Sequence, residues 1–189
     1  MPNGTREVRA EFDGASITVY QAYAPHIAEP AAARQTLRVP GFKTDRMTWV
    51  KPSFLWMMYR SGWATKPGQE RVLKIAITRE GFEWALANGC LSHFDADLHA
   101  SHEAWKHALA TAHVRIQWDP DRDLRLERRE RRAIQVGLSG PAVDRYVDEW
   151  VTAITDVTDL CRAVKSAVDR GDLPEARALL PEERVYPGG

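Results

Sequence analysis

One stretch of this chain, residues 46–63, limits what it can fold into more than any other. Its sequence is RMTWVKPSFLWMMYRSGW, which contains three of the seven tryptophans and three of the four methionines. The rest of the fold has to cover this much apolar surface, yet Arg46, Lys51 and Arg60 interrupt it. Because a core segment has no need of cations, we interpret the stretch as the floor of a binding site. The alternative is a buried strand–helix unit whose tryptophans only fill volume.

The same stretch predicts a strand that runs into a helix. Residues 46–50 alternate as a strand does. Pro52 is suited to the first turn of a helix that continues to about Arg60 and ends at Gly62. Because this helix is apolar on nearly every side, we expect it to be buried.

Strand alternation predicts which side chains face the site. It places Trp49 and Lys51 on the same face of the strand, so Lys51 lies where the chain enters the helix. The first N–H groups of a helix are free and carry a partial positive charge, which predicts a cradle for a phosphate or carboxylate. We expect Trp49 to stack on a base or nicotinamide ring. The candidate ligand-binding residues of the stretch are Arg46, Thr48, Trp49, Lys51, Ser53 and Arg60.

Polar residues at the ends of other strands add to the candidate site. Tyr20, Gln21 and Tyr23 end the first predicted strand, and the Gln21 amide offers both donors and acceptors to a nucleobase or amide. The alternative is that both tyrosines are surface fillers. Gln135 lies on a late strand, and together with Arg115 or Gln117 it could supply polar groups to the same cleft if their strands are neighbours.

The rest of the sequence alternates between strands and helices. β-Branched, alternating segments predict strands at 16–20, 71–78, 114–118 and 132–138. Spacing and caps predict helices at 26–35, 79–88 and 101–112. From Gly140 the pattern is helical to about Leu180. We expect a loop at 90–100, a turn at 119–123 and a tail at 185–189.

This order of elements predicts an α+β fold with a curved, mostly antiparallel sheet flanked by helices and a helical C-terminal third. The length of 189 residues fits a single domain, residues 1–189. Within it we expect a partly ordered N-terminal arm at residues 1–14 and a helical C-terminal part at residues 140–182.

The charge balance excludes a global attraction to nucleic acid. Lys+Arg and Asp+Glu both number 26, so a polyanion could be held only by a local patch. Residues 122–132 offer one, although the interleaved Glu127 and Glu130 equally fit a solvated loop with local ion pairs. The candidate contacts to a nucleotide or nucleic acid there are Arg125, Arg128, Arg129 and Arg132.

The sequence gives no support for a metal-binding protein or a membrane protein. Five of the six histidines fall between residues 93 and 113, but no HExxH pattern or other metal-binding spacing appears, so we expect no metal site. No segment approaches the roughly 20 apolar residues of a membrane span, and no apolar run follows the N-terminus. We therefore expect a cytoplasmic protein that does not enter a membrane.

Several segments together resemble a known but uncharacterised family. They are residues 17–23, 46–63, 118–125, 134–140 and 146–150, and they are similar to the bacterial and fungal family labelled domain of unknown function 4291. The resemblance covers nearly the whole chain, and residues 46–63 are its most specific part. It implies no activity, because the family has none assigned.

A second resemblance concerns chemistry. Tyr20-Gln21, residues 49–55 and Gln135 are similar in arrangement to the NAD-binding elements of ADP-ribosyltransferases that modify nucleic acid, with Lys51 in the cationic place. This implies NAD as cofactor, with Lys51 and Gln135 as catalytic residues. The chain departs from the pattern in two places, because lysine replaces arginine and no glutamate lies on the late strand. A glutamine cannot act as a general base.

The function therefore has alternatives from different classes. The first is an ADP-ribosyltransferase-like enzyme that acts on nucleic acid or a small molecule. The second is a noncatalytic protein that binds a nucleotide or single-stranded nucleic acid by stacking and charge. The third is an interaction protein in which residues 46–63 are simply core. The sequence does not set the substrate or the oligomeric state.

Overall fold

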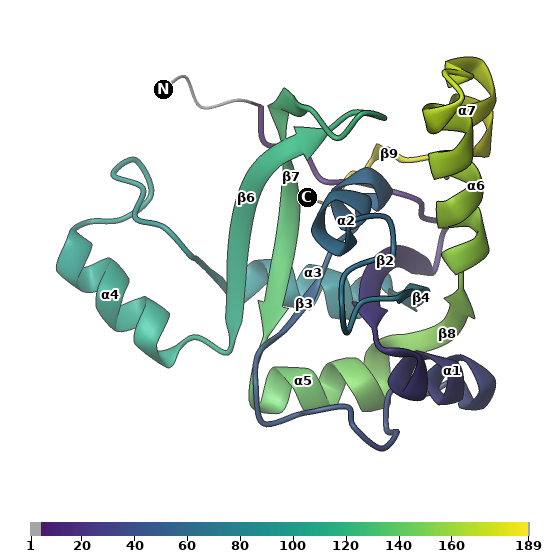
Figure 1. Cartoon of the computed structure of the whole chain (residues 1–189). Coiled ribbons are helices and arrows are strands. Elements are labelled where there is room, and N and C mark those ends of the chain that lie inside the picture. The colour runs from purple at the N-terminus through teal and green to yellow at the C-terminus, as the bar shows by residue number, and fades with distance from the viewer. Residues whose placement is uncertain (1–4, 189) are drawn as a thin grey trace.

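The computed structural model of the chain describes residues 5–188, and it has two main β-sheets surrounded by helices (Figure 1). The first sheet is antiparallel, with strand order β2 (Ser16–Tyr23), β4 (Arg71–Thr78), β8 (Val151–Asp156). The second sheet has the order β3 (Thr48–Val50), β7 (Arg128–Leu138), β6 (Val114–Arg122), β5 (Gly89–Leu91). Only the β5–β6 pair is parallel among the described strands. The predicted α+β class is confirmed.

A third, small sheet joins the two ends of the described chain. Strand β1 (Arg9–Ala10) pairs antiparallel with β9 (Arg184–Val185). The predicted N-terminal arm thus contains a paired strand, while its residues 1–4 lie outside the described residues. The predicted C-terminal tail begins with the partner strand.

The helices begin and end largely where the sequence predicts. Ser53 caps α2 by accepting a hydrogen bond from the Trp56 N–H, and Gly62 ends the helix at φ +60°. Ser101 likewise caps α4. The helices are α1 (Pro25–Arg34), α2 (Phe54–Ser61), α3 (Arg79–Ala87), α4 (His102–Thr111), α5 (Pro141–Arg145) with the π-helical turn η1 (Tyr146–Trp150), α6 (Thr158–Asp169) and α7 (Leu173–Leu179).

The two main sheets meet at a single point between β2 and β3. The Tyr20 N–H donates a hydrogen bond of 2.8 Å to the Lys51 carbonyl, which forms an isolated bridge. Beyond it β2 follows β4 and β3 follows β7, so the strands on the two sides are not paired. A wedge between the sheets therefore opens next to Lys51.

The core has two parts. The larger part packs around both sheets and includes Ile75, Phe82, Val136 and Trp150. The smaller part lies between α2, α6 and α7 and includes Phe54, Met58, Cys161, Val164 and Ala176. Figure 1 shows α6 and α7 at one side of the molecule and α4 at the other.

The turn predicted at residues 119–123 is wrong. Strand β6 continues through Pro120 to Arg122, and its pairing with β7 shifts between these two residues. A bulge tolerates proline because one N–H there needs no ladder partner. The actual turn begins at Asp123, whose carboxylate accepts hydrogen bonds from the N–H groups of Arg125 and Glu127.

Two segments predicted without strands contain one. The C-terminal part, predicted to be helical, holds the strand β8 between η1 and α6. Its sequence, VTAITD, is rich in β-branched residues, which pack well on a pleated surface. The predicted loop at residues 90–100 begins within β5, which pairs with β6.

We predict that Gly81→Ala destabilises the fold although alanine favours helices. A Cβ atom built on Gly81 in α3 would lie 2.3 Å from Cγ of Trp150, in the larger core. Overpacking of this kind lowers the free energy of unfolding by about 1–3 kcal/mol, which urea unfolding measures. Gly14→Ala is the matched control, because no atom lies within 4 Å of the added Cβ. Equal stability of the two variants would contradict this packing.

Candidate functional site

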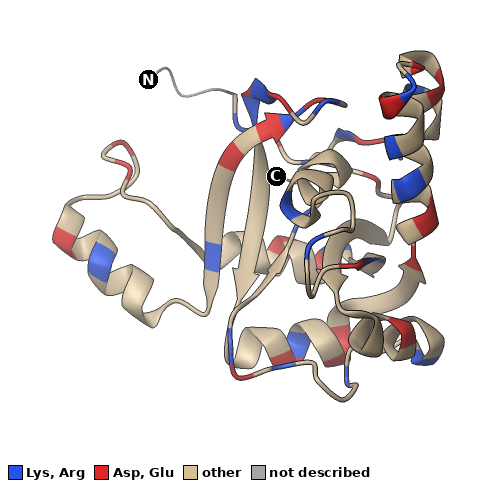
Figure 2. Cartoon of the chain, in the orientation of Figure 1, with Lys and Arg blue, Asp and Glu red and all other residues tan. Residues whose placement is uncertain are grey.

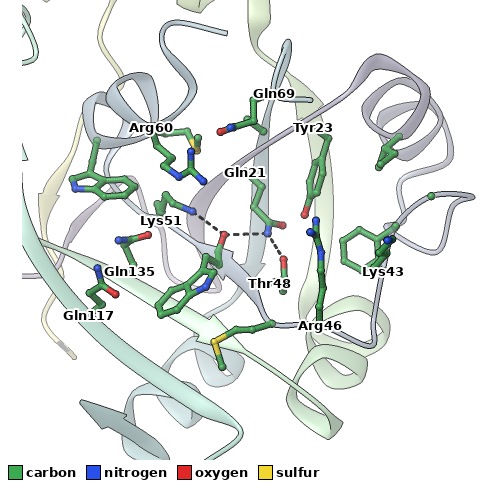
Figure 3. A pocket seen from close by; sticks show the side chains of 18 residues that line it. Gln21, Tyr23, Lys43, Arg46, Thr48, Lys51, Arg60, Gln69, Gln117 and Gln135 are labelled. Atoms are coloured by element: carbon green, nitrogen blue, oxygen red, sulfur yellow. Dashed lines mark hydrogen bonds between the residues drawn. The ribbon is translucent and has the colours of Figure 1, made fainter. Parts of the chain in front are cut away.

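A cavity of about 540 Å³ lies at the junction of the two main sheets (Figure 3). Its walls come from the end of β2, the loop before β3, β3 itself, α2, and the facing positions of β6 and β7. The sequence-predicted residues that line it are Gln21, Tyr23, Arg46, Thr48, Trp49, Lys51, Arg60 and Gln135. The structure thus brings together residues that lie up to 114 positions apart, from Gln21 to Gln135.

The charged residues that line the cavity are all cationic. They are Lys43, Arg46, Lys51 and Arg60, and no Asp or Glu is among the lining residues in the described chain. Figure 2 shows Lys and Arg mixed with Asp and Glu elsewhere on the helices and strands, so this excess is local. A concave surface with one sign of charge concentrates ligands of the other sign.

Lys51 is the most unusual group in the cavity. Its side chain is buried, with 6% of the residue exposed, and Nζ donates a hydrogen bond of 3.1 Å to the Trp49 carbonyl. Burial and, to a smaller extent, the nearby Arg60 guanidinium lower the pKa of Lys51 while Asp119 acts in the opposite direction, and together they leave it at about 7. The amine is therefore partly neutral near pH 7.

Gln21 connects the two sides of the wedge. Its Nε2 donates to the Thr48 hydroxyl at 2.7 Å and to the Trp49 carbonyl at 3.1 Å, and its Oε1 accepts a hydrogen bond of 2.7 Å from the Tyr146 hydroxyl. Both amide N–H groups are thereby used. Gln21 shapes the wall, and one lone pair of Oε1 remains for a ligand.

Two buried polar groups on the cavity wall, the Tyr23 hydroxyl and the Trp56 indole N–H, have no well-formed hydrogen bond within residues 5–188. The Thr48 hydroxyl nevertheless lies near enough to Tyr23 to act on its pKa. Burial raises the pKa of Tyr23 to about 12, so its hydroxyl stays protonated. Figure 3 shows Tyr23 next to Arg46. Buried polar groups are normally paired, so these two are available to a polar ligand.

Gln135 lines the cavity and is bonded to a carboxylate, Asp119, that is not itself a lining residue and that the sequence analysis missed. Gln117 and Gln135 are opposite each other on β6 and β7, and both donate amide N–H groups to the Asp119 carboxylate, Gln117 at 3.1 Å. We had assigned Asp119 to a turn. The alternation of polar residues 115, 117 and 119 was the signal that would have found it.

Trp49 forms a flat aromatic part of the wall. A Cβ atom at Gly137, its partner on β7, would lie 3.0 Å from the Trp49 ring and 2.7 Å from the Met47 sulfur. Only glycine leaves room for the indole to lie across the neighbouring strand. The ring is therefore held in place as a stacking surface.

Ser53 does not contribute to the cavity, which corrects the predicted phosphate cradle. Its hydroxyl caps α2 and donates a hydrogen bond of 3.3 Å to Asp121. The Phe54 N–H donates to the Glu183 carboxylate at 2.6 Å, and burial raises the pKa of Glu183 to about 7. A carboxylate of the chain itself thus occupies the start of α2, where we expected a ligand phosphate.

Tyr20 also lies outside the cavity. Its ring packs edge-to-face on Phe54 at 5.5 Å between centroids, in the smaller core. Strand alternation directs Tyr20 and Gln21 to opposite faces of β2, so only Gln21 and Tyr23 of the predicted group reach the site.

The arginines predicted to contact nucleic acid do not line this cavity. Arg125, Arg128 and Arg129 are exposed near the tip of the β6–β7 hairpin, where Glu127 and Glu130 lie between them. Arg132 is partly buried and donates a hydrogen bond of 3.3 Å to the Trp118 carbonyl. Three of the four residues are thus exposed and the fourth is tied to β6.

In the histidine-rich segment, the rings of two histidines pack against a phenylalanine. Phe94 packs against His102 at 5.2 Å and against His99 at 5.9 Å between ring centroids. Within residues 5–188, no group of three or more His, Cys, Asp or Glu side chains could hold a metal ion. None of the helices in the same range combines the length and apolarity needed to cross a bilayer.

We predict that Lys51→Met stabilises the folded protein at neutral pH. Lys51 has a pKa of about 7 when folded and roughly 10.4 when unfolded. Between these values unfolding takes up a proton, so the stability of the native sequence rises with pH and falls as pH drops toward 7. Methionine removes this dependence and adds about 2–4 kcal/mol to the free energy of unfolding at pH 7.

Urea unfolding of both proteins between pH 7 and pH 9 measures this difference, which should shrink as pH rises. An equal dependence on pH in the two proteins would show that the Lys51 amine is not desolvated.

Comparison with known proteins identifies the family but no activity. The model of a family described as a domain of unknown function (DUF4291) matches residues 7–186, which include every residue that lines the cavity and both strands of the small terminal sheet. No curated protein matches the sequence. The chain therefore belongs to the family labelled domain of unknown function 4291.

Proposed function

We propose that the cavity binds a nucleotide, with NAD as the first candidate, and that the protein transfers ADP-ribose from NAD to a nucleic acid or small molecule. The observation that carries the proposal is the chemistry of the wall. Four cations, four glutamine amides and two tryptophans line a space of about 540 Å³, with no carboxylate among the described lining residues. Phosphates, a base edge and flat rings are the three parts of a nucleotide that such groups bind.

Different residues of the wall are suited to bind the phosphates, the base edge and the flat rings of a nucleotide. Arg46 and Arg60 are suited to pair with phosphate oxygens, and arginine does so with two parallel hydrogen bonds. Trp49 offers a face for stacking, and the free Trp56 N–H and Tyr23 hydroxyl offer donors. The volume lies within the roughly 300–1,000 Å³ typical of small-molecule sites.

The chemistry that NAD would supply is an ADP-ribosyl group whose bond to nicotinamide breaks to leave a positively charged sugar. The chain would contribute a fixed negative charge next to the wall, from Asp119, which does not line the cavity but is bonded to two residues that do. Gln117 and Gln135 hold the Asp119 carboxylate by three N–H contacts, so its orientation does not depend on the ligand. Such preorganised charge stabilises a developing charge of opposite sign. In this proposal Gln135 positions Asp119 and is not itself a base.

The first prediction concerns binding. Arg60→Gln should weaken the binding of NAD roughly tenfold, because a charge-assisted hydrogen bond to phosphate is lost at a partly solvated site. Isothermal titration calorimetry measures the change. Arg162→Gln on α6 is the control, since that exposed side chain pairs only with Asp159 among the described residues. Absence of heat and of a thermal shift at millimolar NAD would rule out NAD as the ligand.

The second prediction concerns turnover. Asp119→Asn should lower the rate of nicotinamide release from NAD by on the order of tenfold to a hundredfold, with the affinity for NAD nearly unchanged, because the amide keeps the shape but not the charge. Chromatography of released nicotinamide measures the rate. Asp159→Asn, at an exposed position on α6, is the control. An unchanged rate in Asp119→Asn would remove Asp119 from the mechanism.

A noncatalytic nucleotide or single-stranded nucleic-acid binder is the second candidate. It is favoured by one observation, the absence of a carboxylate among the described lining residues, which leaves stacking, positive charge and the Lys51 amine but no carboxylate acid or base on the wall. Binding of NAD, AMP and short oligonucleotides with similar, salt-sensitive affinity, and without release of nicotinamide, would support this candidate over the transferase.

A further inference from the structure

The environment of Lys51 differs from that of the lysines that form ion pairs in the described chain. Lys74 forms an ion pair with Glu11 and Lys165 with Asp169, whereas the described ion pairs include none for Lys51. Its single hydrogen bond is to the Trp49 carbonyl. An ammonium group has three donors, so among the described residues a charged Lys51 would have one hydrogen bond, the face of the Trp56 ring at 5.7 Å and no counterion.

Charged groups on two neighbouring elements act on this amine. The Arg60 guanidinium, on α2, disfavours a second positive charge, and Asp119, on β6, favours it. The effect of Asp119, which is bonded to two glutamine amides, is the smallest of the three influences on the pKa of Lys51, after burial and Arg60. Together they leave this pKa at about 7. A neutral amine carries a free lone pair and is a nucleophile at neutral pH.

We propose that Lys51 forms an imine with the carbonyl group of a phosphorylated sugar or other phosphorylated aldehyde bound in the cavity. The geometry supports this because Nζ is held by one hydrogen bond at the cavity wall (Figure 3). Lys43 and Arg46 line the same cavity and would bind the phosphate. The proposal needs the anion-binding cavity but does not need NAD.

The covalent step is balanced without any further reactant. The Lys51 lone pair attacks the carbonyl carbon, and the carbonyl oxygen takes up a proton to give a carbinolamine. The oxygen then leaves as water, having received both hydrogens of the neutral amine, and a carbon–nitrogen double bond remains.

Two sources supply such a carbonyl. One is the open-chain ribose of ADP-ribose, which the proposed transferase would release when water is the acceptor, and the other is an independent sugar phosphate.

The test is reductive trapping in the full chain. The protein is incubated near pH 7.5 with ribose 5-phosphate, ADP-ribose or ribose, each with cyanoborohydride, and adducts are located by peptide mass spectrometry. We expect Lys51 to be modified on the order of tenfold faster than the exposed Lys106 on α4, because a larger share of its amine is neutral. Both phosphorylated sugars should react faster than ribose.

Three variants control the experiment. Lys51→Met and Lys51→Arg should abolish the fast reaction while circular dichroism shows that they are folded, and Lys106→Arg should leave the reaction unchanged. Modification of Lys51 at the rate of Lys106, or equal rates with ribose and ribose 5-phosphate, would overturn the proposal.

The outcomes also separate this inference from the proposed function. NAD binding without any Lys51 adduct would leave the nucleotide site standing and refute the imine. Trapping of ribose 5-phosphate, with neither NAD binding nor an ADP-ribose adduct, would support the imine, assign the carbonyl to an independent sugar phosphate and refute the transferase.

Discussion

A single backbone hydrogen bond, from the Tyr20 N–H to the Lys51 carbonyl, decides where the site lies. The two main sheets touch there and are not paired beyond it. Parting strands leave backbone groups without ladder partners, and such groups must be satisfied in another way. The Trp49 carbonyl is one of them, and it accepts hydrogen bonds from both the Gln21 amide and the Lys51 amine. The same separation of strands therefore creates the cavity and anchors the amine on its wall.

The positive charge of the cavity comes from side chains, and the start of α2 is used for stability. Glu183 and Ser53 satisfy N–H groups in the first turn of that helix, which ties the C-terminal segment to the centre of the fold. Arg60 is at the other end of the same helix. The segment that we interpreted as one binding element thus has two faces, of which one is structural and the other lines the cavity. Lys51 is buried without an ion pair among the described residues, with the Trp49 carbonyl and the Trp56 ring, 5.7 Å away, as its partners, and a buried amine of this kind in a cavity is a candidate functional residue.

Local patterns were enough to predict much of the fold and part of the site. Strand β4 and the caps of α2 and α4 follow from alternation, serine caps and glycine stops that act within a few residues. Trp49 and Lys51 were placed on one face of a strand by the same rule. What could not be predicted depends on distant partners. Glu183 reaches Phe54 over 129 positions, and no local signal shows that the start of α2 is already occupied.

Asp119 was missed for the opposite reason. The alternation of polar residues around it is a local signal for a strand, but the neighbouring proline favoured the prediction of a turn. The residue changes how the site is understood, because it is the negative charge that acts on Lys51 against Arg60. A ligand phosphate that paired with Arg60 would remove the repulsion and favour the charged form of Lys51. A phosphate held by Lys43 and Arg46, which Figure 3 shows on the side of the cavity away from Gln117 and Gln135, would leave Arg60 unpaired and the amine neutral. In the proposed site, the position of a phosphate would therefore decide whether Lys51 is a cation or a neutral amine.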